Sequence, residues 1–192
     1  MENYKNIKTV DDVILLYEEF GASNYIGEEV SQTEHSIQAA LLAKEDGCDN
    51  DTVVAALLHD IGHLIGMKYS LEEMEKLGCV RHEAVGAEVL KQIGINDKVC
   101  SLVKNHVNAK RYLVTKDKNY YIQLSEASKQ TLTYQGGLMS DDEIKSFEDD
   151  QYFESYIKLR NFDDKAKIKD KKIPLLSAFK SIIEKCILIT EN

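Results

Sequence analysis

The chain has 192 residues, 43% of them hydrophobic and 30% charged, a balance that excludes a fibrous or intrinsically disordered protein. This length predicts a single domain over residues 1–192, because one hydrophobic core usually serves about 100–200 residues. The formal net charge of −9 argues against a nucleic-acid partner, since phosphate backbones are bound by basic patches.

Neither secretion nor membrane insertion is indicated by the sequence. Acidic residues interrupt the first apolar stretch, in MENYKNIKTVDDVILLYEEF, which is not typical of a signal peptide. No apolar run approaches the roughly 20 residues that span a bilayer. The four cysteines are scattered without a CxxC pair, as is usual for reduced thiols. We therefore expect a soluble, cytoplasmic protein with no membrane partner.

A single proline and few alternating β-branched residues predict helix nearly throughout the chain. The residues Ser31–Glu34 form a capping box that opens a helix, which runs to about Asp46 and closes at Gly47. The next helix, VVAALLHDIGHL, begins at Asp51 and Thr52. The predicted fold class is all-α.

Further boundaries are predicted along the rest of the chain. A helix over Arg81–Gly94 ends on its glycine, and the next helix begins after Asn96. A second capping box starts at Ser140, and Pro174 lies near the first turn of an amphipathic last helix, LLSAFKSIIEKCILI. The charged segment Asp163–Lys172 is predicted to be a solvated connector, apart from its first residue.

Histidines are the most informative residues of this sequence. Each falls on a predicted helix and shares a helical face with apolar residues, which are expected to be buried. A single such histidine is more often a hydrogen-bonded core residue than a ligand, but five of them beside the carboxylate of Asp60 favour a metal site. The five are His35, His59, His63, His82 and His106.

Acidic residues extend this set of candidate ligands. Asp60 follows the apolar run VVAALL, so its carboxylate is expected to be withdrawn from water, where a bound cation would stabilise it. Asp163 is the candidate for a later ligand, with Asp164 as the alternative. Taken alone, an ion pair with Arg160 on a surface helix over 151–162 explains this motif better. Histidine and aspartate ligands favour iron, manganese, zinc or cobalt, and the residues alone do not choose among them.

Lys110 lies four residues after His106 and has two interpretations. If the helix continues through Asn108, the ammonium group projects near the same cavity and holds an anionic group. A lysine exposed at the C-terminus of a helix explains the position equally well. The sequence leaves both interpretations open.

The candidate ligands follow the pattern of a known family. His35, the pair His59-Asp60, and Asp163 resemble the H…HD…D signature of the HD-domain superfamily, helical metal-dependent proteins that are mostly phosphohydrolases. With His82 and His106 added, the pattern is similar to the six-ligand set of HD-domain proteins that bind two metals. The resemblance implies an HD-domain helical bundle with a metal site in its core.

Shorter motifs resemble one branch of this superfamily more closely. The branch consists of mixed-valent diiron oxygenases that act on 2-amino-1-hydroxyethylphosphonate, and the resemblance covers residues 24 to about 165. An ordinary HD-domain hydrolase has no need of the Tyr25 and Glu28 pair or of the YQGG motif. The matching segments are Asn24–Glu28, Gln32–Ser36, His106–Leu113, Leu124–Ser128 and Thr131–Gly137.

This resemblance implies a role for each site residue. Tyr25 and Glu28 would guard an open coordination site of an Fe2+/Fe3+ pair and move when substrate binds. The first iron would be held by His35, His59, Asp60 and Asp163. The second iron would be held by His82, His106 and the same Asp60, which bridges the two. The residues that match positions near the phosphonate and amine of the substrate are His63, Lys110, Ser128, Gln135 and Arg160.

The implied reaction is oxidation by O2 that breaks the C–P bond of a 1-hydroxy-2-aminoethylphosphonate-type substrate, giving glycine, or a methylated analogue, and phosphate. An HD-type phosphohydrolase acting on a phosphate ester is the alternative, because the same ligands serve both reactions. A metal-stabilised module that binds a partner ranks third. The segment Ile65–Val80 and the last helix match the branch poorly, and these differences are expected to shape the amine end of the pocket.

Overall fold

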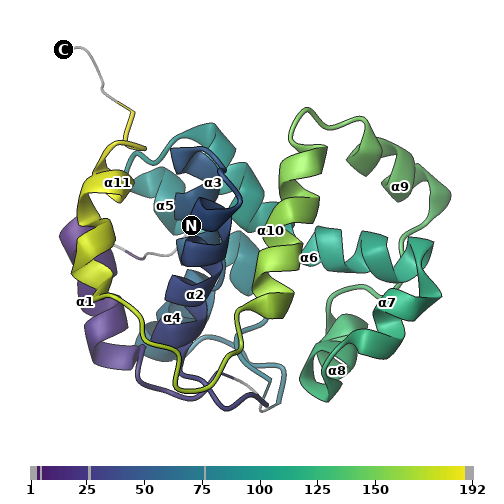
Figure 1. Ribbon diagram of the computed structural model, residues 1–192, viewed down its shortest axis with the longest axis horizontal. Helices are drawn as coiled ribbons and strands as arrows, with labels where there is room; N and C mark the ends of the chain where they lie inside the picture. Colours follow the sequence, from purple (N-terminus) through teal and green to yellow (C-terminus); the bar gives the residue numbers. More distant parts are fainter. Residues whose placement is uncertain (1–3, 5, 26, 76, 189–192) are drawn as a thin grey trace.

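Helices dominate the computed structural model of the chain, which describes residues 4, 6–25, 27–75 and 77–188 (Figure 1). Within these residues, extended segments pair only through isolated β-bridges, so the prediction of an all-α fold is confirmed. The helices are α1 (Val10–Phe20), α2 (Gln32–Glu45), α3 (Asn50–Leu58), α4 (Ile61–Tyr69), α5 (His82–Gln92), α6 (Asp97–Lys116), α7 (Lys118–Gln123), α8 (Glu126–Tyr134), α9 (Asp141–Glu148), α10 (Phe153–Lys165) and α11 (Lys180–Glu184).

Capping residues begin and end several helices where the sequence predicts. Ser31 forms a capping box with Glu34 at the start of α2, and Gly47 adopts a φ of 73° just beyond its end. Asn96 caps α6 through its side chain, and Ser140 forms the second capping box at the start of α9. These boundaries depend on local hydrogen bonds, which is why short motifs predict them.

The helix predicted over VVAALLHDIGHL is wrong in one respect, because the segment forms two helices. α3 ends at Leu58 and α4 begins at Ile61, with His59 and Asp60 at the junction. Asp60 leaves helical geometry at φ −101° and ψ 9°, and its carbonyl accepts the His63 N–H that starts α4. Neighbouring side chains in an unbroken helix point about 100° apart, whereas this break turns the side chains of His59 and Asp60 toward one site.

α3 lies at the centre of the bundle. Its side chains from Thr52 to Leu58 are buried, and α2, α6 and α10 pack around it. From this core α6 extends toward α7, α8 and α9, which lie together at one end of the molecule (Figure 1). Segments far apart in the sequence therefore meet at the C-terminal end of α3.

The last helix is shorter than predicted. A 3-10 turn over Leu176–Phe179 leads into α11, which ends at Glu184. Beyond it, the chain extends and Ile187 forms an antiparallel β-bridge with Ile95, in which the Leu188 N–H donates to the Gly94 carbonyl. The predicted end of this helix, Ile189, lies outside the described residues. No helix in the described part of the chain is long and apolar enough to cross a membrane.

The segment Asp163–Lys172 is more than the solvated connector that its charge predicts. α10 continues to Lys165, and Ala166 is completely buried. The Gln38 side chain on α2 bonds to both backbone groups of Ile168, donating to its carbonyl at 2.9 Å and accepting from its N–H at 3.0 Å. The segment is thereby fixed against α2.

Candidate metal centre and active site

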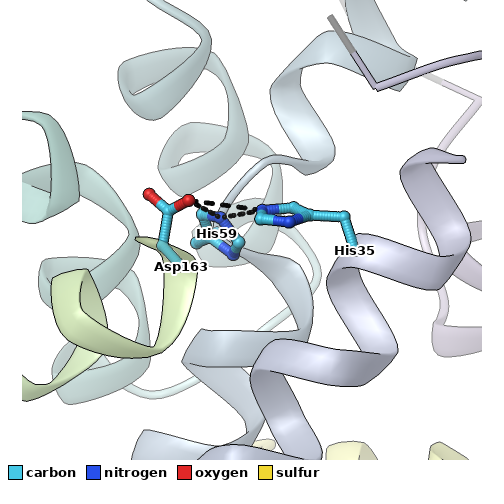
Figure 2. Close-up of side chains that lie close together, drawn as sticks. All are labelled: His35, His59 and Asp163. Atoms are coloured by element: carbon cyan, nitrogen blue, oxygen red, sulfur yellow. Dashed lines mark hydrogen bonds and ion pairs between the residues drawn. The ribbon is translucent and has the colours of Figure 1, made fainter. Parts of the chain in front are cut away.

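Three ligand-type side chains from separate elements meet in the core (Figure 2). His35 comes from α2, His59 from the end of α3, and Asp163 from α10, and all three are buried. The Nε2 atom of His35 lies 3.1 Å from Nε2 of His59 and 3.4 Å from Oδ1 of Asp163. The Nε2 atom of His59 lies 3.8 Å from the same carboxylate oxygen. Three donor atoms thus face one small volume.

Asp60 joins this group to a second one. Its Oδ2 atom lies 3.6 Å from Nε2 of His35 and 3.3 Å from Nε2 of His59. Its Oδ1 atom lies 3.3 Å from Nε2 of His82, on α5, and 3.4 Å from Nε2 of His106, on α6. The Nε2 atoms of His82 and His106 are 3.1 Å apart. Each oxygen of one carboxylate therefore serves a different pair of histidines, as a ligand that bridges two cations does.

Hydrogen bonds indicate which nitrogen of each ring carries the proton. Nδ1 of His35 lies 3.0 Å from the Ala166 carbonyl oxygen, and Nδ1 of His59 lies 2.9 Å from that of Ala56. A carbonyl oxygen only accepts, so each ring in its neutral form, the form that binds a metal, is protonated at Nδ1 and points its Nε2 lone pair at the other ring. Two lone pairs at 3.1 Å repel each other unless a cation lies between them. The donor set therefore fits a metal ion.

Spacing and charge fit a metal as well. Ligand atoms about 2.1 Å from one ion lie about 3.0 Å apart in octahedral and about 3.4 Å apart in tetrahedral coordination. Burial alone would raise the pKa of Asp60, but the neighbouring histidines, His59 first, hold it well below its usual range. Burial likewise opposes ionisation of Asp163, and Arg160 lowers the pKa of that carboxyl well below its usual range. Two buried negative charges are thus present, and a cation stabilises both.

Arg160 binds both Asp163 and Asp164, but only one of these two aspartates faces the cluster. Its Nη1 donates to Oδ2 of Asp163 at 2.6 Å, while Oδ1 of Asp163 is buried without a hydrogen-bond partner among the described residues. Asp164 faces away from the cluster, since its carboxylate binds Arg160 and accepts from the Tyr120 hydroxyl at 2.6 Å. Asp163, rather than the alternative Asp164, lies among the histidines. The guanidinium of Arg160 positions it.

His63 lies beside the cluster in a different orientation. Its Nδ1 accepts the Cys79 N–H at 3.0 Å, so the proton of the neutral ring is on Nε2. Its ring stacks on that of His82 with centroids 4.0 Å apart, and burial, with the charge of His82, lowers its pKa well below the usual range. The spacing of Asp60, His63 and His82 would suit a metal, but a ring with N–H on Nε2 is a hydrogen-bond donor.

A cavity of about 50 Å³ adjoins the cluster. Asp60, His82 and His106 reach its wall, as do Tyr25 and Glu28. The residues predicted to contact substrate that line it are His63, Lys110, Ser128, Gln135 and Arg160. The structure thus brings every predicted site residue to the cluster or to this cavity, and their individual roles stay predictions.

Lys110 points into the protein, which excludes the interpretation as an exposed lysine. α6 continues past it to Lys116, and only 3% of Lys110 is exposed. Its ammonium donates to Oγ1 of Thr131 at 2.9 Å and to the Ser128 carbonyl at 3.3 Å. Burial, with the charge of Arg160 second, lowers the pKa of Lys110 to about 7. An anion bound beside it would hold the proton in place.

Tyr25 and Glu28 come from the loop between α1 and α2; Ile26, between them, lies outside the described residues. The ring of Tyr25 stacks on His35 with centroids 3.8 Å apart and planes 15° apart. Burial, followed by the charges of Asp60 and Asp163, raises its pKa well above the usual value, so the hydroxyl stays protonated. The Glu28 carboxylate forms an ion pair with Lys167 at 2.8 Å. Their predicted movement on substrate binding stays a prediction.

Several residues of the cavity wall were not found by sequence reasoning. Thr131, which contacts Lys110, lies one turn after Ser128 on α8, and that helical spacing was the available signal. Lys167 carries no such signal, because it follows α10 in a run of charged residues. Met74 and Leu77 supply apolar wall from the poorly matching segment 65–80.

The six-residue cluster has a counterpart among known protein families. The sequence pattern of the HD domain matches residues 33–134, more than half of the chain and the part that carries five of the six ligand candidates. The chain belongs to the HD-domain family. Its predicted resemblance to that family is therefore confirmed.

Several relatives of this HD-domain protein extend the similarity to nearly the full chain. An uncharacterized protein of Acanthamoeba polyphaga mimivirus is 45% identical over 92% of this chain and 81% of its own. The hydroxymethylphosphonate dioxygenase of Gimesia maris is 37% identical, over 93% of this chain and 88% of its own. The [1-hydroxy-2-(trimethylamino)ethyl]phosphonate dioxygenase (glycine-betaine-forming) of Leisingera caerulea is 34% identical, over 90% of this chain and 87% of its own. These similarities confirm the prediction that this HD-domain protein is an enzyme of the oxygenase class.

Proposed function

We propose that this HD-domain protein is a non-heme diiron oxygenase that uses O2 to cleave the C–P bond of a 1-hydroxy-2-aminoethylphosphonate-type substrate. The products would be glycine, or a methylated analogue, and phosphate. The observation that carries the proposal is the Tyr25 ring stacked on His35, beside an Asp60 carboxylate whose two oxygens each face a separate pair of histidines. Two relatives that are named phosphonate dioxygenases support the reaction class.

Two ions would be held at the cluster. His35, His59 and Asp163 would bind one, His82 and His106 the other, and Asp60 both. An Fe2+/Fe3+ pair would supply activation of O2 and polarise the hydroxyl group of the substrate. The carbonyls of Ala166, Ala56 and Val103 accept from Nδ1 of His35, His59 and His106, which would leave the Nε2 atoms of these rings to hold the ions.

The phosphonate would bind at the wall of the cavity that carries the donors. Lys110 offers a buried ammonium group, and Nε2 of His63 offers an N–H, so both can donate to a phosphonate oxygen. Thr131 and the Ser128 carbonyl hold the lysine in place before substrate arrives. Arg160 contributes positive charge nearby, although its guanidinium already binds the two aspartates.

Tyr25 covers the cluster. Its ring lies on His35, and its protonated hydroxyl is surrounded by the charges of Asp60 and Asp163. In this position the ring would keep water away from the ligands, and it would have to move, at least in part, for substrate to reach them. Glu28, three residues later, would move with it.

The stoichiometry constrains the reaction. One 2-amino-1-hydroxyethylphosphonate and one O2 give one glycine and one phosphate, with all atoms accounted for. C1 is oxidised to a carboxyl group while both oxygen atoms of O2 are reduced and enter the products. No further reductant is needed, so the protein has to supply only binding, orientation and the metal pair.

Phosphate release in the presence and absence of O2 tests the proposal. We expect purified protein to contain about two iron ions per chain, with an S = 1/2 signal in electron paramagnetic resonance from the half-reduced pair. It should release phosphate from 2-amino-1-hydroxyethylphosphonate and consume an equal amount of O2. Phosphate release from phosphate esters without O2, by protein loaded with manganese or cobalt, would instead assign the protein to the HD-type phosphohydrolases.

A further inference from the structure

Lys167 contacts both residues of the loop that covers the metal centre. Its ammonium lies 2.8 Å from Oε1 of Glu28 and 5.7 Å from the centre of the Tyr25 ring. Only 16% of the Lys167 side chain and 17% of the Glu28 side chain are exposed, so solvent screens this ion pair weakly. The pair is therefore stronger than an ordinary surface contact.

The backbone beside Lys167 is fixed to α2. On one side, the Ala166 carbonyl accepts from Nδ1 of His35. On the other, Ile168 exchanges two hydrogen bonds with the side chain of Gln38. The backbone on both sides of Lys167 is thus held against α2, which fixes the position from which its side chain reaches Glu28.

The ion pair also lies at the boundary between two cavities. Glu28, Ser125 and Lys167 line both the cavity at the metal centre and a neighbouring cavity of about 390 Å³. The larger cavity continues to Tyr120 and Asp164. A substrate group that points away from the metal centre in this direction meets Glu28 and Lys167 first.

The charges of the Glu28–Lys167 ion pair bear on which substrates can bind beside it. Apart from Asp60 and Asp163 of the cluster, Glu28 is the carboxylate on the wall of the metal-centre cavity within the described residues. An ammonium group on the substrate would form an ion pair with this carboxylate, which already accepts a hydrogen bond from the ammonium group of Lys167. A substrate without a cation has no such competition.

We propose that Lys167 is a specificity-determining residue, an internal competitor that weakens the binding of ammonium-bearing phosphonates relative to uncharged ones by occupying Glu28. The inference rests on the proposed function, because it takes the substrates to be hydroxyphosphonates bound at this metal centre. It concerns the group beyond C1 and leaves the chemistry at C1 unchanged.

Substitution of Lys167 tests this inference with a matched control. Lys167→Met removes the competitor, and Lys167→Arg keeps the charge. Lys169→Met removes the neighbouring ion pair between Lys169 and Glu29, which has the same 2.8 Å length but is exposed. Dissociation constants for 2-amino-1-hydroxyethylphosphonate and hydroxymethylphosphonate are measured by calorimetry without O2, so that binding is separated from turnover.

The expected result is a change in selectivity rather than a general loss. In Lys167→Met, binding of the ammonium-bearing compound should improve relative to hydroxymethylphosphonate by roughly fivefold, the effect of a modest ion pair. The ratio should stay within about twofold of the wild type in Lys167→Arg and Lys169→Met. An unchanged or reduced ratio in Lys167→Met would overturn the inference.

Hydrogen exchange supplies a second measurement that does not depend on a ligand. The amides of Tyr25 and Glu28 bond within their own loop, to the carbonyls of Val30 and Tyr25. They should exchange several times faster in Lys167→Met, while amides of α2 keep their rates. Faster exchange with unchanged selectivity would make Lys167 a purely structural residue and contradict the inference.

The proposed function and the inference can fail separately. Binding of the two phosphonates without any turnover would overturn the proposed function and leave the inference standing, whereas absence of binding of both compounds would overturn both.

Discussion

Backbone carbonyl groups orient three of the four imidazole rings of the candidate metal centre. His59 and His106 bond to carbonyls three residues earlier in their own helices, whereas His35 bonds to the carbonyl of Ala166, 131 residues away in sequence. Each bond favours the tautomer with its proton on Nδ1 and leaves the Nε2 lone pair free to bind a metal. Folding thus orients these three rings before any metal binds.

The carboxylate of Asp60 is predicted to be essential for binding two ions. In Asp60→Asn an amide nitrogen, which cannot act as a ligand in this way, replaces one of the two oxygens that face separate histidine pairs. We expect metal analysis to fall from about two ions per chain to about one or fewer. Asp164→Asn is the control, because Asp164 is a neighbour of the cluster that binds Arg160 and Tyr120 instead. Retention of both ions in Asp60→Asn would contradict the bridging assignment.

The lowered pKa of Lys110 leads us to predict a specific pH dependence of substrate binding. Burial lowers its pKa to about 7, so the free enzyme loses this positive charge as the pH rises through that value. Below pH 7 the ammonium is present and binds a phosphonate; above it, binding must first recover a proton, and the KM should rise by up to about tenfold per pH unit. Lys110→Arg keeps its charge throughout this range. The ratio of the wild-type KM to that of Lys110→Arg should therefore increase between about pH 6.5 and pH 8.5. Ionisation of the substrate cancels in the ratio, and a constant ratio would contradict the prediction.

At the scale of elements, the break between α3 and α4 builds the site. It brings His59 and Asp60 to the cluster together and leaves His63 one turn into α4, against His82. The approach of α4 to α5 is close because Gly62 has no side chain: a Cβ atom there would lie 1.9 Å from the His82 carbonyl oxygen. The glycine in the run HDIGH is therefore a packing requirement of the metal centre.

Substitution of Gly62 by alanine should separate α4 from α5. The new methyl group would collide with backbone, which cannot rotate away, so we expect a loss of about 3 kcal/mol in the free energy of unfolding. Metal content should also fall, since His82 would move away from Asp60. Gly86→Ala is the control, because its Cβ would lie 3.1 Å from the Ile61 side chain and 3.3 Å from the Gly62 backbone nitrogen, contacts that a small shift relieves, and alanine favours a helix by about 1 kcal/mol. Thermal unfolding and metal analysis of the two variants test this prediction. Equal losses of stability and of metal in both variants would contradict the packing role of Gly62.

Local and distant interactions differ in how far the sequence predicts them. The capping boxes at Ser31 and Ser140 were predictable because the groups that bond lie three residues apart. The histidine and aspartate candidates followed from burial patterns and a family resemblance. The break at His59 and Asp60 could not be foreseen, since the apolar periodicity of VVAALLHDIGHL continues across it. Lys167 was missed because its contacts with Glu28 and Tyr25 depend on how α10 ends.

At the scale of the whole molecule, the site is less negative than the chain as a whole. The chain carries a formal charge of −9, whereas the cavity wall balances the carboxylates of Glu28, Asp60 and Asp163 with the cations Lys110, Arg160 and Lys167. Two of these cations are more than 95% buried, where low dielectric strengthens their effect on a bound anion. An anionic substrate is thus attracted locally, regardless of net charge.

Metal removal is expected to destabilise the entire fold. The ligands come from α2, the α3–α4 junction, α5, α6 and α10, so without a cation these elements must pack around two buried carboxylates, those of Asp60 and Asp163. A ligand present at about 1,000 times its dissociation constant stabilises a protein by about 4 kcal/mol. For a chain of this length that corresponds to roughly 10 °C in Tm.

Chelation followed by dialysis should lower the Tm by about this amount or more, and added iron should restore it. A double variant with Asp60→Asn and Asp163→Asn should show no change on chelation, because it lacks both carboxylates. A wild-type Tm that is the same with and without metal would show that the cluster is not a metal site that the fold depends on.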